Sequence, residues 1–108
     1  MITGCAHAGV VNTAKHAVDL LGGAVPLHAV VGGFHLGADD HEHIRTTVAD
    51  LKALRPVVLL PGHCSGWRAK FEIERQMPGR LVPCTSWGKI YLLKAYSIRT
   101  PLYVSFVL

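Results

Sequence analysis

Several features that define other protein classes are missing from this sequence of 108 residues. It has only three cysteines, an odd number in no regular framework, which argues against a disulfide scaffold and for a reducing compartment. Its N-terminus lacks a basic region followed by an apolar core, so no signal peptide is expected. No uncharged apolar run approaches the ~18 residues that a membrane span needs. We therefore expect a cytoplasmic protein without a membrane partner.

Charged residues are also scarce, at 17% of the chain against 50% hydrophobic residues. The formal net charge of +4 suits an anionic small-molecule substrate, but lysine and arginine form no block, so no nucleic-acid partner is expected. The length fits one domain, and a chain this small leaves much of its surface exposed. The apolar composition therefore predicts either a partner chain or oligomer covering apolar surface, or a piece of a larger domain.

The residues that are present are organised around positions 56–66, Pro-Val-Val-Leu-Leu-Pro-Gly-His-Cys-Ser-Gly. The run 57–60 has no polar alternation, which is typical of a strand buried on both faces. Pro61 ends the ladder, and Gly62 permits a bend that other residues do not. His63 is thus predicted at the carboxyl end of a central strand, where open α/β sheets place their ligands.

The same pattern occurs twice more upstream. A glycine-flanked His7 follows a strand-like start, and His35 follows an apolar run and a glycine pair. If the three strands are parallel neighbours, His7, His35 and His63 converge at one edge of the sheet, as in a metal or catalytic site.

Helical and strand-like segments alternate along the chain. Apolar spacing predicts helices over residues 10–21, 41–54 and 66–76, with Asp39 or Asp40 capping the second. The predicted buried faces consist of Val10, Ala14, Ala17, Val18 and Leu21 in the first helix and of Ile44, Val48, Leu51 and Leu54 in the second. On the exposed side of the third helix, Arg68 with Glu72 and Lys70 with Glu74 are spaced for ion pairs. Strands are predicted at residues 1–5, 26–31, 57–60 and 80–84. This order indicates an α/β fold whose sheet is at least partly parallel.

Two polar groups at predicted helix starts have competing interpretations. Ser65 and Arg68 open the helix after His63. Because a helix N-terminus favours anions, these two residues could bind a phosphate. Equally, Ser65 could be a helix cap and Arg68 a surface residue. The cluster at 39–43, Asp-Asp-His-Glu-His, resembles a metal site, but residues two apart on a helix do not face each other. We interpret this cluster as an acidic helix start.

Four motifs resemble the C-terminal half of a metallo-β-lactamase-fold protein. Residues 4–13 read Gly-Cys-Ala-His-Ala-Gly-Val-Val-Asn-Thr, residues 32–36 read Gly-Gly-Phe-His-Leu, residues 60–67 read Leu-Pro-Gly-His-Cys-Ser-Gly-Trp, and residues 78–84 read Pro-Gly-Arg-Leu-Val-Pro-Cys. Within that superfamily they are most similar to the branch of 7,8-dihydropterin-6-methyl-aminobenzene ribofuranosyl 5′-phosphate synthase-like proteins.

The resemblance implies an αββα sandwich, of which this chain would be the C-terminal half, with one or two metal ions at the sheet edge, usually zinc and sometimes iron or manganese. His7 and His63 match metal ligands of the family, and His35 stands where many relatives carry a bridging aspartate. The family's His-x-His-x-Asp-His cluster is absent from the 108 residues. Residues 1–85 would then form a partial domain, and residues 86–108 a divergent apolar tail.

Two functions from different classes follow. The first is a truncated metal-dependent enzyme that is inactive alone and has an incomplete metal site at His7, His35 and His63. The intact parent enzyme would act on phosphorylated or anionic small molecules, by hydrolysis or by pterin-type condensation. The alternative is a small structural zinc module using Cys5, His7, His63 and Cys64, although these spacings differ from those of zinc ribbons. A third interpretation treats the cysteines, Cys84 above all, as small buried hydrophobes.

Overall fold

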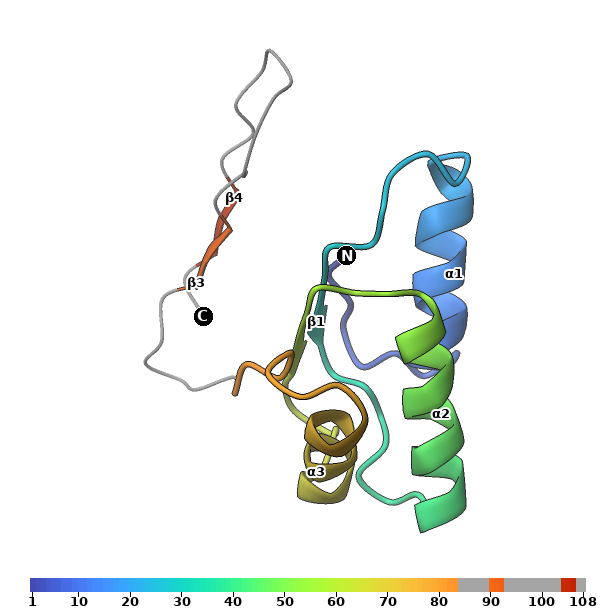
Figure 1. Ribbon diagram of the computed structural model, residues 1–108, viewed down its shortest axis with the longest axis vertical. Coiled ribbons are helices and arrows are strands. Elements are labelled where there is room, and N and C mark those ends of the chain that lie inside the picture. Colours follow the sequence, from blue (N-terminus) through green and yellow to red (C-terminus); the bar gives the residue numbers. More distant parts are fainter. Residues whose placement is uncertain (84–89, 93–103, 107–108) are drawn as a thin grey trace.

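Helices and strands alternate in the computed structural model, which describes residues 1–83, 90–92 and 104–106 (Figure 1). The order is α1 (Val10–Leu20), β1 (Ala29–Gly32), α2 (His41–Ala53), β2 (Val58–Pro61), α3 (Trp67–Gln76), β3 (Ile90–Leu92) and β4 (Val104–Phe106). The predicted α/β fold with alternating elements is confirmed.

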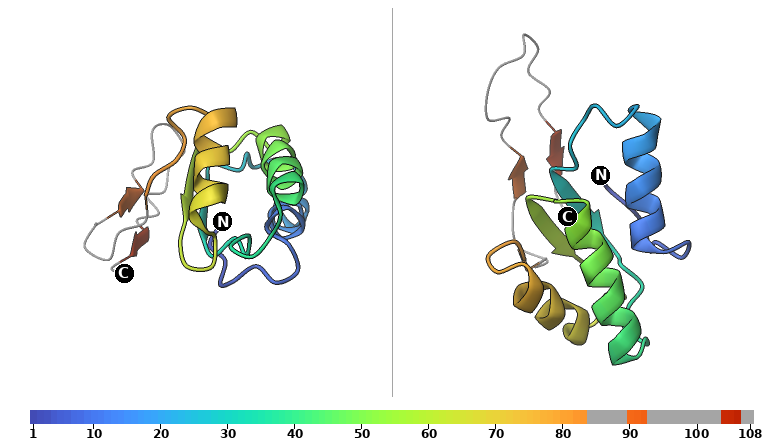
Figure 2. Two further views of the ribbon diagram at one scale, coloured as in Figure 1. Left: turned by 90° about the horizontal axis from the view of Figure 1, so that it is seen from below. Right: turned by 45° about the vertical axis from the view of Figure 1, so that its right-hand side comes forward.

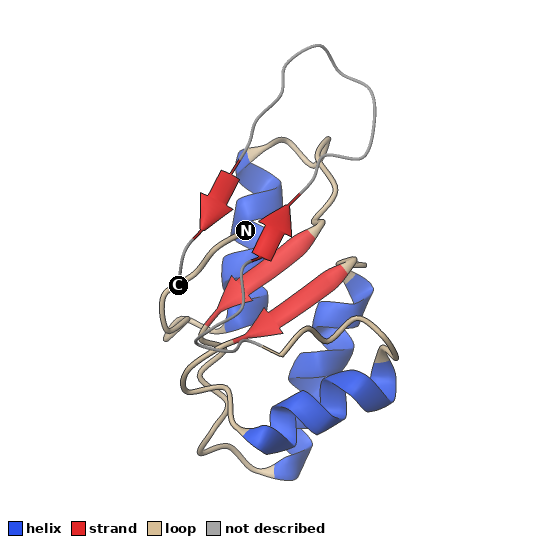
Figure 3. Cartoon of the chain, turned by 90° about the vertical axis from the view of Figure 1, so that its left-hand side faces the viewer, coloured by secondary structure: helices blue, strands red, loops and turns tan. Residues whose placement is uncertain are grey.

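A parallel pair, β1 and β2, lies at the centre of the fold, with the register running from Ala29 opposite Val58 to Gly32 opposite Pro61. Single parallel bridges extend this sheet on both sides, from Ile2 to Val31 and from Leu81 to Leu59. The spatial order of these segments therefore follows the chain order. Right-handed crossovers then place successive helices on one face of the sheet, and Figure 1 shows α1 and α2 on the same side. Figure 3 shows β1 and β2 in front of the helices.

The two outer strands are shorter than predicted. Residues 1–5 and 80–83 each contribute one bridge rather than a strand. On the C-terminal side, the Val82 N–H donates to the Leu59 carbonyl, but Pro83 has no N–H with which to continue the ladder. Cys84 lies outside the described residues, as does most of the predicted tail, so the division at residue 85 stays a prediction. β3 and β4 pair with each other in a separate antiparallel sheet.

The core lies between the parallel sheet and the helices. Ile44, Val48 and Leu51 of α2 are buried as predicted, with Leu54 half-buried beside them. The strands add Val30 and Leu59, and the loop after β1 adds Phe34, whose side chain is 1% exposed. Full burial of each such side chain contributes about 1.5–3 kcal/mol to the free energy that favours folding. This core fixes the strands whose ends carry the predicted site.

Helix α1 buries a shorter stripe than predicted. Val10 and Ala14 are buried, but Leu21 is 56% exposed, which corrects its assignment to the buried face. The helix ends at Leu20, where Gly22 and Gly23 take left-handed conformations and turn the chain away.

Helix α2 begins as predicted, because a carboxylate oxygen of Asp40 accepts the His43 N–H at 2.8 Å. In the described part of the chain, no helix is long and apolar enough to cross a lipid bilayer. Figure 2 shows α2 and α3 side by side, and the Gln76 side chain of α3 donates to the Arg45 carbonyl of α2 at 3.0 Å.

Candidate metal centre

Three loops carry the predicted histidines, and they follow three neighbouring parallel segments of the sheet. His7 follows the bridge at Ile2, His35 follows β1, and His63 follows β2. Because parallel segments end at the same edge, the loops meet there. The predicted convergence of the three histidines on one edge is confirmed by two clusters of side chains that share Cys5. Their role as metal ligands stays a prediction.

The first cluster consists of Cys5, His7 and His35. Each offers one ligand atom, and these three atoms lie within 4.8 Å of one another. The rings of His7 and His35 stack, with their centroids 4.2 Å apart and an angle of 26° between their planes. The Cys5 Sγ atom lies 3.4 Å from Nδ1 of His35. Both histidines are exposed, so solvent and ligands reach them.

The second cluster consists of Cys5, His63 and Cys64, whose ligand atoms also lie within 4.8 Å of one another. The two Sγ atoms are 2.9 Å apart, and both thiols are free and partly exposed. The hydrogen bond with Cys64 raises the pKa of the Cys5 thiol above its usual value, and desolvation adds to the shift. Cys5 therefore joins the two clusters into one continuous group of sulfur and nitrogen donors.

Unusual backbone conformations concentrate in these loops. Among the described residues, four that are not glycine have φ in the left-handed region, and three of them, Ala6, His35 and Cys64, belong to the loops of the clusters. Such conformations persist only where the surroundings impose them, and they gather at functional sites. Gly33 allows the close packing, since a Cβ atom there would lie 2.8 Å from both the Cys64 Sγ and the His63 ring.

Ser65 does not cap α3, which corrects the prediction. Its hydroxyl accepts the Phe34 N–H at 3.1 Å and donates to the His63 carbonyl at 3.4 Å, and the side chain is fully buried. Gly66 occupies the cap position of α3 without a side-chain hydrogen bond. Ser65 thus ties the loop of His35 to the loop of His63.

Arg68 is exposed, and its guanidinium carbon lies 5.6 Å from the centre of the Trp67 ring. The predicted pairs of Arg68 with Glu72 and of Lys70 with Glu74 are wrong. Glu72 instead accepts two hydrogen bonds from Arg75, at 2.6 and 2.9 Å, because a guanidinium fits a carboxylate at both oxygens. Glu74 accepts the Gly79 N–H at 3.0 Å.

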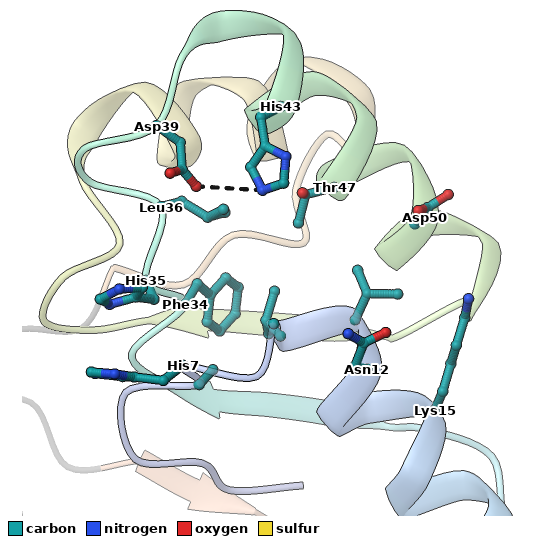
Figure 4. Close-up of a pocket in the computed structure, with 14 residues that line it drawn as sticks. His7, Asn12, Lys15, Phe34, His35, Leu36, Asp39, His43, Thr47 and Asp50 are labelled. Atoms are coloured by element: carbon teal, nitrogen blue, oxygen red, sulfur yellow. Dashed lines mark ion pairs between the residues drawn. The ribbon is translucent and has the colours of Figure 1, made fainter.

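A pocket of about 360 Å³ adjoins the first cluster. Figure 4 shows His7 and His35 at one end of the pocket, with Lys15 at the other. Its lining comes from the start of α1, the loop after β1 and the inner side of α2: Ala6, His7, Gly9, Val10, Val11, Asn12, Lys15, Phe34, His35, Leu36, Asp39, His43, Thr47 and Asp50. Neither Ser65 nor Arg68 lines it.

Sequence reasoning missed several polar residues of this pocket. It assigned Asp39 and His43 only to a helix start, whereas the His43 Nε2 atom lies 3.5 Å from a carboxylate oxygen of Asp39 and both side chains line the pocket. Their spacing of four residues was the available signal, because a residue just before a helix can reach a side chain in its first turn. Cys5 was considered only for the alternative zinc module, because no spacing rule relates a loop cysteine to histidines about 30 and 60 residues away.

Comparisons with known proteins found relatives in sequence. The chain is 33% identical over 90 residues to the 7,8-dihydropterin-6-methyl-4-(β-D-ribofuranosyl)-aminobenzene-5′-phosphate synthase of Methanocaldococcus jannaschii, a match that covers 76% of this chain and 30% of the synthase. It is 30% identical over 75 residues to an uncharacterized protein of the same archaeon, covering 69% of this chain and 27% of that protein. No family model matches the chain.

A solved structure shows the same relationship in three dimensions. The crystal structure of a metal-dependent hydrolase of the β-lactamase superfamily matches this chain with a TM-score of 0.67 and 32% sequence identity, over 77% of this chain and 32% of the hydrolase. The chain thus spans about a third of the length of the relatives it matches. The predicted resemblance is therefore confirmed, and this chain is similar in sequence and in fold to part of a metallo-β-lactamase superfamily protein.

Proposed function

We propose that this chain supplies one part of a divalent metal centre in an enzyme that acts on phosphorylated or otherwise anionic small molecules. The observation that carries the proposal is the pair of clusters at the sheet edge, in which the ligand atoms of Cys5, His7 and His35, and those of Cys5, His63 and Cys64, lie within 4.8 Å of one another. Such density of sulfur and imidazole donors in exposed loops has no role in packing the core.

The donor set fits zinc best. Imidazole nitrogen and thiolate sulfur are the usual zinc ligands, whereas calcium and magnesium prefer oxygen, and manganese is suited to carboxylates. Within the described residues, neither cluster contains a carboxylate. His7 and His35 would hold the ion on the pocket side, and His63 and Cys64 on the side of α3, with Cys5 between them. Iron stays compatible with the imidazoles.

The surrounding residues shape where a substrate binds. A bound divalent ion would lower the pKa of a coordinated water and polarise a phosphoryl or carbonyl oxygen. The buried Phe34 ring forms an apolar wall beside His7 and His35, and Lys15 offers the pocket a positive charge. The imidazole of His43, next to the Asp39 carboxylate, is placed to accept a proton from a group bound in the pocket.

The names of the relatives support an anionic substrate. One is a metal-dependent hydrolase, and the other is a synthase whose named compound carries a ribofuranosyl 5′-phosphate. We propose that the complete enzyme carries out hydrolysis or pterin-type condensation on such a molecule, with its charged group directed toward Lys15.

This chain by itself is expected to bind metal without turnover. It spans about a third of each relative, and its sequence contains no His-x-His-x-Asp-His cluster. A partner chain or a second copy would cover exposed apolar side chains such as Trp67, 66% exposed, and Phe71, 70% exposed. We propose the cytosol as the location of the chain, because free thiols such as those of Cys5 and Cys64 are usual in a reducing compartment.

A structural zinc module is the second candidate, and the cluster of Cys5, His63 and Cys64 favours it, because it brings together three of the four ligands of that alternative. The two candidates differ at His35, which the module does not use. A closed structural site also retains its ion against chelators, whereas an open site exchanges it.

The proposal is tested by measuring zinc, manganese and iron binding by calorimetry and elemental analysis. The His7→Ala, His35→Ala and His63→Ala variants are expected to weaken zinc binding at least about tenfold. The matched control is His16→Ala, an exposed histidine on α1 outside both clusters, which should bind zinc like the unmodified chain. Full binding by the His35→Ala variant with chelator-resistant zinc would instead support the structural module, and equal binding by all four variants would refute both.

A further inference from the structure

Two thiols lie in direct contact at the sheet edge, between the two histidine loops. The Sγ atoms of Cys5 and Cys64 are 2.9 Å apart, and the Cys64 Sγ also lies 3.8 Å from the Cys5 carbonyl oxygen. A disulfide bond is about 2.0 Å long, so the sulfur atoms need to approach by less than about 1 Å to bond. Rotation about a cysteine Cα–Cβ bond moves the sulfur atom by distances of this order.

Both cysteines are held in place by their neighbours. The Gly4 carbonyl, one residue before Cys5, accepts the Gly33 N–H at 2.7 Å. The Cys64 carbonyl accepts the Gly37 N–H at 2.9 Å. The two thiols therefore face each other because the parallel sheet and its loops are folded, although 59 positions separate them in the sequence. Both are partly exposed, so a small reagent can reach them.

We propose that Cys5 and Cys64 are a redox-active thiol pair, which a small-molecule disulfide such as oxidised glutathione converts to an intramolecular disulfide. In the first step, one thiolate attacks a sulfur of glutathione disulfide and releases one glutathione thiol, leaving a mixed disulfide on the protein. In the second step, the other cysteine attacks the protein sulfur of that mixed disulfide and releases the second glutathione. The protein loses two electrons and two protons, and one glutathione disulfide becomes two glutathione thiols.

This pair connects redox state to metal binding, a consequence that rests on the proposed function. Cys5 belongs to both clusters, and a sulfur in a disulfide is no longer the thiolate that binds metal. Oxidation therefore removes the donor that joins the two clusters, and bound zinc in turn shields both thiols from oxidation.

The experiment treats the reduced full chain with oxidised glutathione and follows it by intact mass and peptide mapping. We expect a peptide in which Cys5 is joined to Cys64 with the loss of two hydrogen masses, no glutathione on either of these two cysteines, and recovery of both thiols with a reductant. Oxidation should raise the thermal midpoint by roughly 10 °C or more, because the bond closes a loop across most of the described fold.

Single substitutions identify the partners. In a Cys84→Ser background, Cys5→Ser and Cys64→Ser should each stop at a stable glutathione adduct on the remaining cysteine, since no second thiol is left to displace the glutathione. Cys84→Ser is the matched control and should form the bond as the unmodified chain does. Adducts without an internal bond in the unmodified chain, or a bond that is lost in Cys84→Ser, would overturn the proposal.

A final arm separates this inference from the metal site. Saturating zinc should slow the oxidation at least about tenfold if Cys5 is a ligand. Formation of the Cys5–Cys64 bond at an unchanged rate in zinc would uphold the thiol pair and refute a thiolate metal centre. The opposite result is zinc binding that depends on the histidines, together with no internal disulfide after oxidation of the metal-free chain. It would uphold the metal centre and refute the redox-active thiol pair.

Discussion

Helices α1 and α3 begin with similar local structure, but the surroundings of their first turns differ. Each starts shortly after a predicted ligand, His7 or His63, and behind a glycine in a left-handed conformation, Gly9 with φ 90° or Gly66 with φ 74°. Neither helix has a side-chain cap at its start, whereas α2 is capped by Asp40. By local sequence and backbone alone, both starts are candidates for binding an anion.

Packing decides between them. The start of α1 lines the pocket beside His7 and His35, so a ligand in the pocket would lie next to its first turn. The start of α3 packs against the loop after β1, where a Cβ atom on Gly66 would lie 2.8 Å from the Gly37 Cα. The buried Ser65 hydroxyl closes the same junction from inside. The start of α1 thus adjoins the pocket, while the glycine at the start of α3 packs against the loop of His35 and helps to hold His63 and Cys64 in place.

The largest expected effect comes from adding a methyl group at each glycine cap. Gly66→Ala combines left-handed strain with a backbone clash, and should lower the free energy of unfolding by about 3 kcal/mol or more. Gly9→Ala carries the strain, but its Cβ atom meets only the movable Asn12 side chain, at 3.2 Å, so about 1–2 kcal/mol is expected. Urea denaturation of both variants measures the difference. Equal losses would show that α3 is packed no more tightly than α1.

A second comparison uses the hydroxyl groups near the two helix starts. Ser65→Ala leaves the Phe34 N–H buried without an acceptor, which should cost about 1–3 kcal/mol. Thr13→Ala removes an exposed hydroxyl that donates to the Gly9 carbonyl at 2.9 Å, and a change within about 0.5 kcal/mol is expected. Thermal and urea unfolding give both values. If Ser65→Ala left the free energy of unfolding unchanged, the loops of His35 and His63 would not be joined through this side chain.

A third comparison asks which helix start attracts an anion. With zinc bound, Lys15→Gln should weaken phosphate binding about twofold to fivefold, because it removes the cation lining the pocket. Arg68→Gln, at the start of α3 and outside the pocket lining, should change it less. Calorimetric titration with phosphate provides the measurement. A larger loss of phosphate affinity in Arg68→Gln than in Lys15→Gln would support the anion site at Ser65 and Arg68 that the sequence suggested.

The smallest effect concerns the far side of α3, where the hydrogen bond from Arg75 lowers the pKa of Glu72 to about 2. In the unfolded chain this carboxyl titrates near 4.5, so its stabilising contribution is complete above that pH and is lost as the pH falls toward 2. The unmodified chain should therefore exceed Glu72→Gln in stability by less than about 1 kcal/mol at neutral pH, with the difference vanishing between pH 4.5 and 2. A difference that does not vary over this range would exclude the Glu72 carboxylate as its source.

Local patterns predicted much of the fold. The apolar spacing of Ile44, Val48 and Leu51 indicated the buried face of α2, because residues three and four apart share a helix face. The outer strands and Leu21 were predicted less well, since their pairing and burial depend on neighbours that no short window contains. The Ser65 cap was wrong because a better partner, the Phe34 N–H, comes from a distant loop.

Sequence patterns alone specified the alternation of helices and strands and the placement of His7, His35 and His63 just after three β-segments. This information is local, because a run of apolar residues that ends at glycine specifies both a strand and its end. The folded structure was needed to show that Cys5 joins the histidines into two clusters, that Asp39 and His43 face a pocket, and that α1 rather than α3 begins beside this pocket. The physical reason is that these are contacts between loops distant in the chain, and only the pairing of the parallel segments brings such loops together.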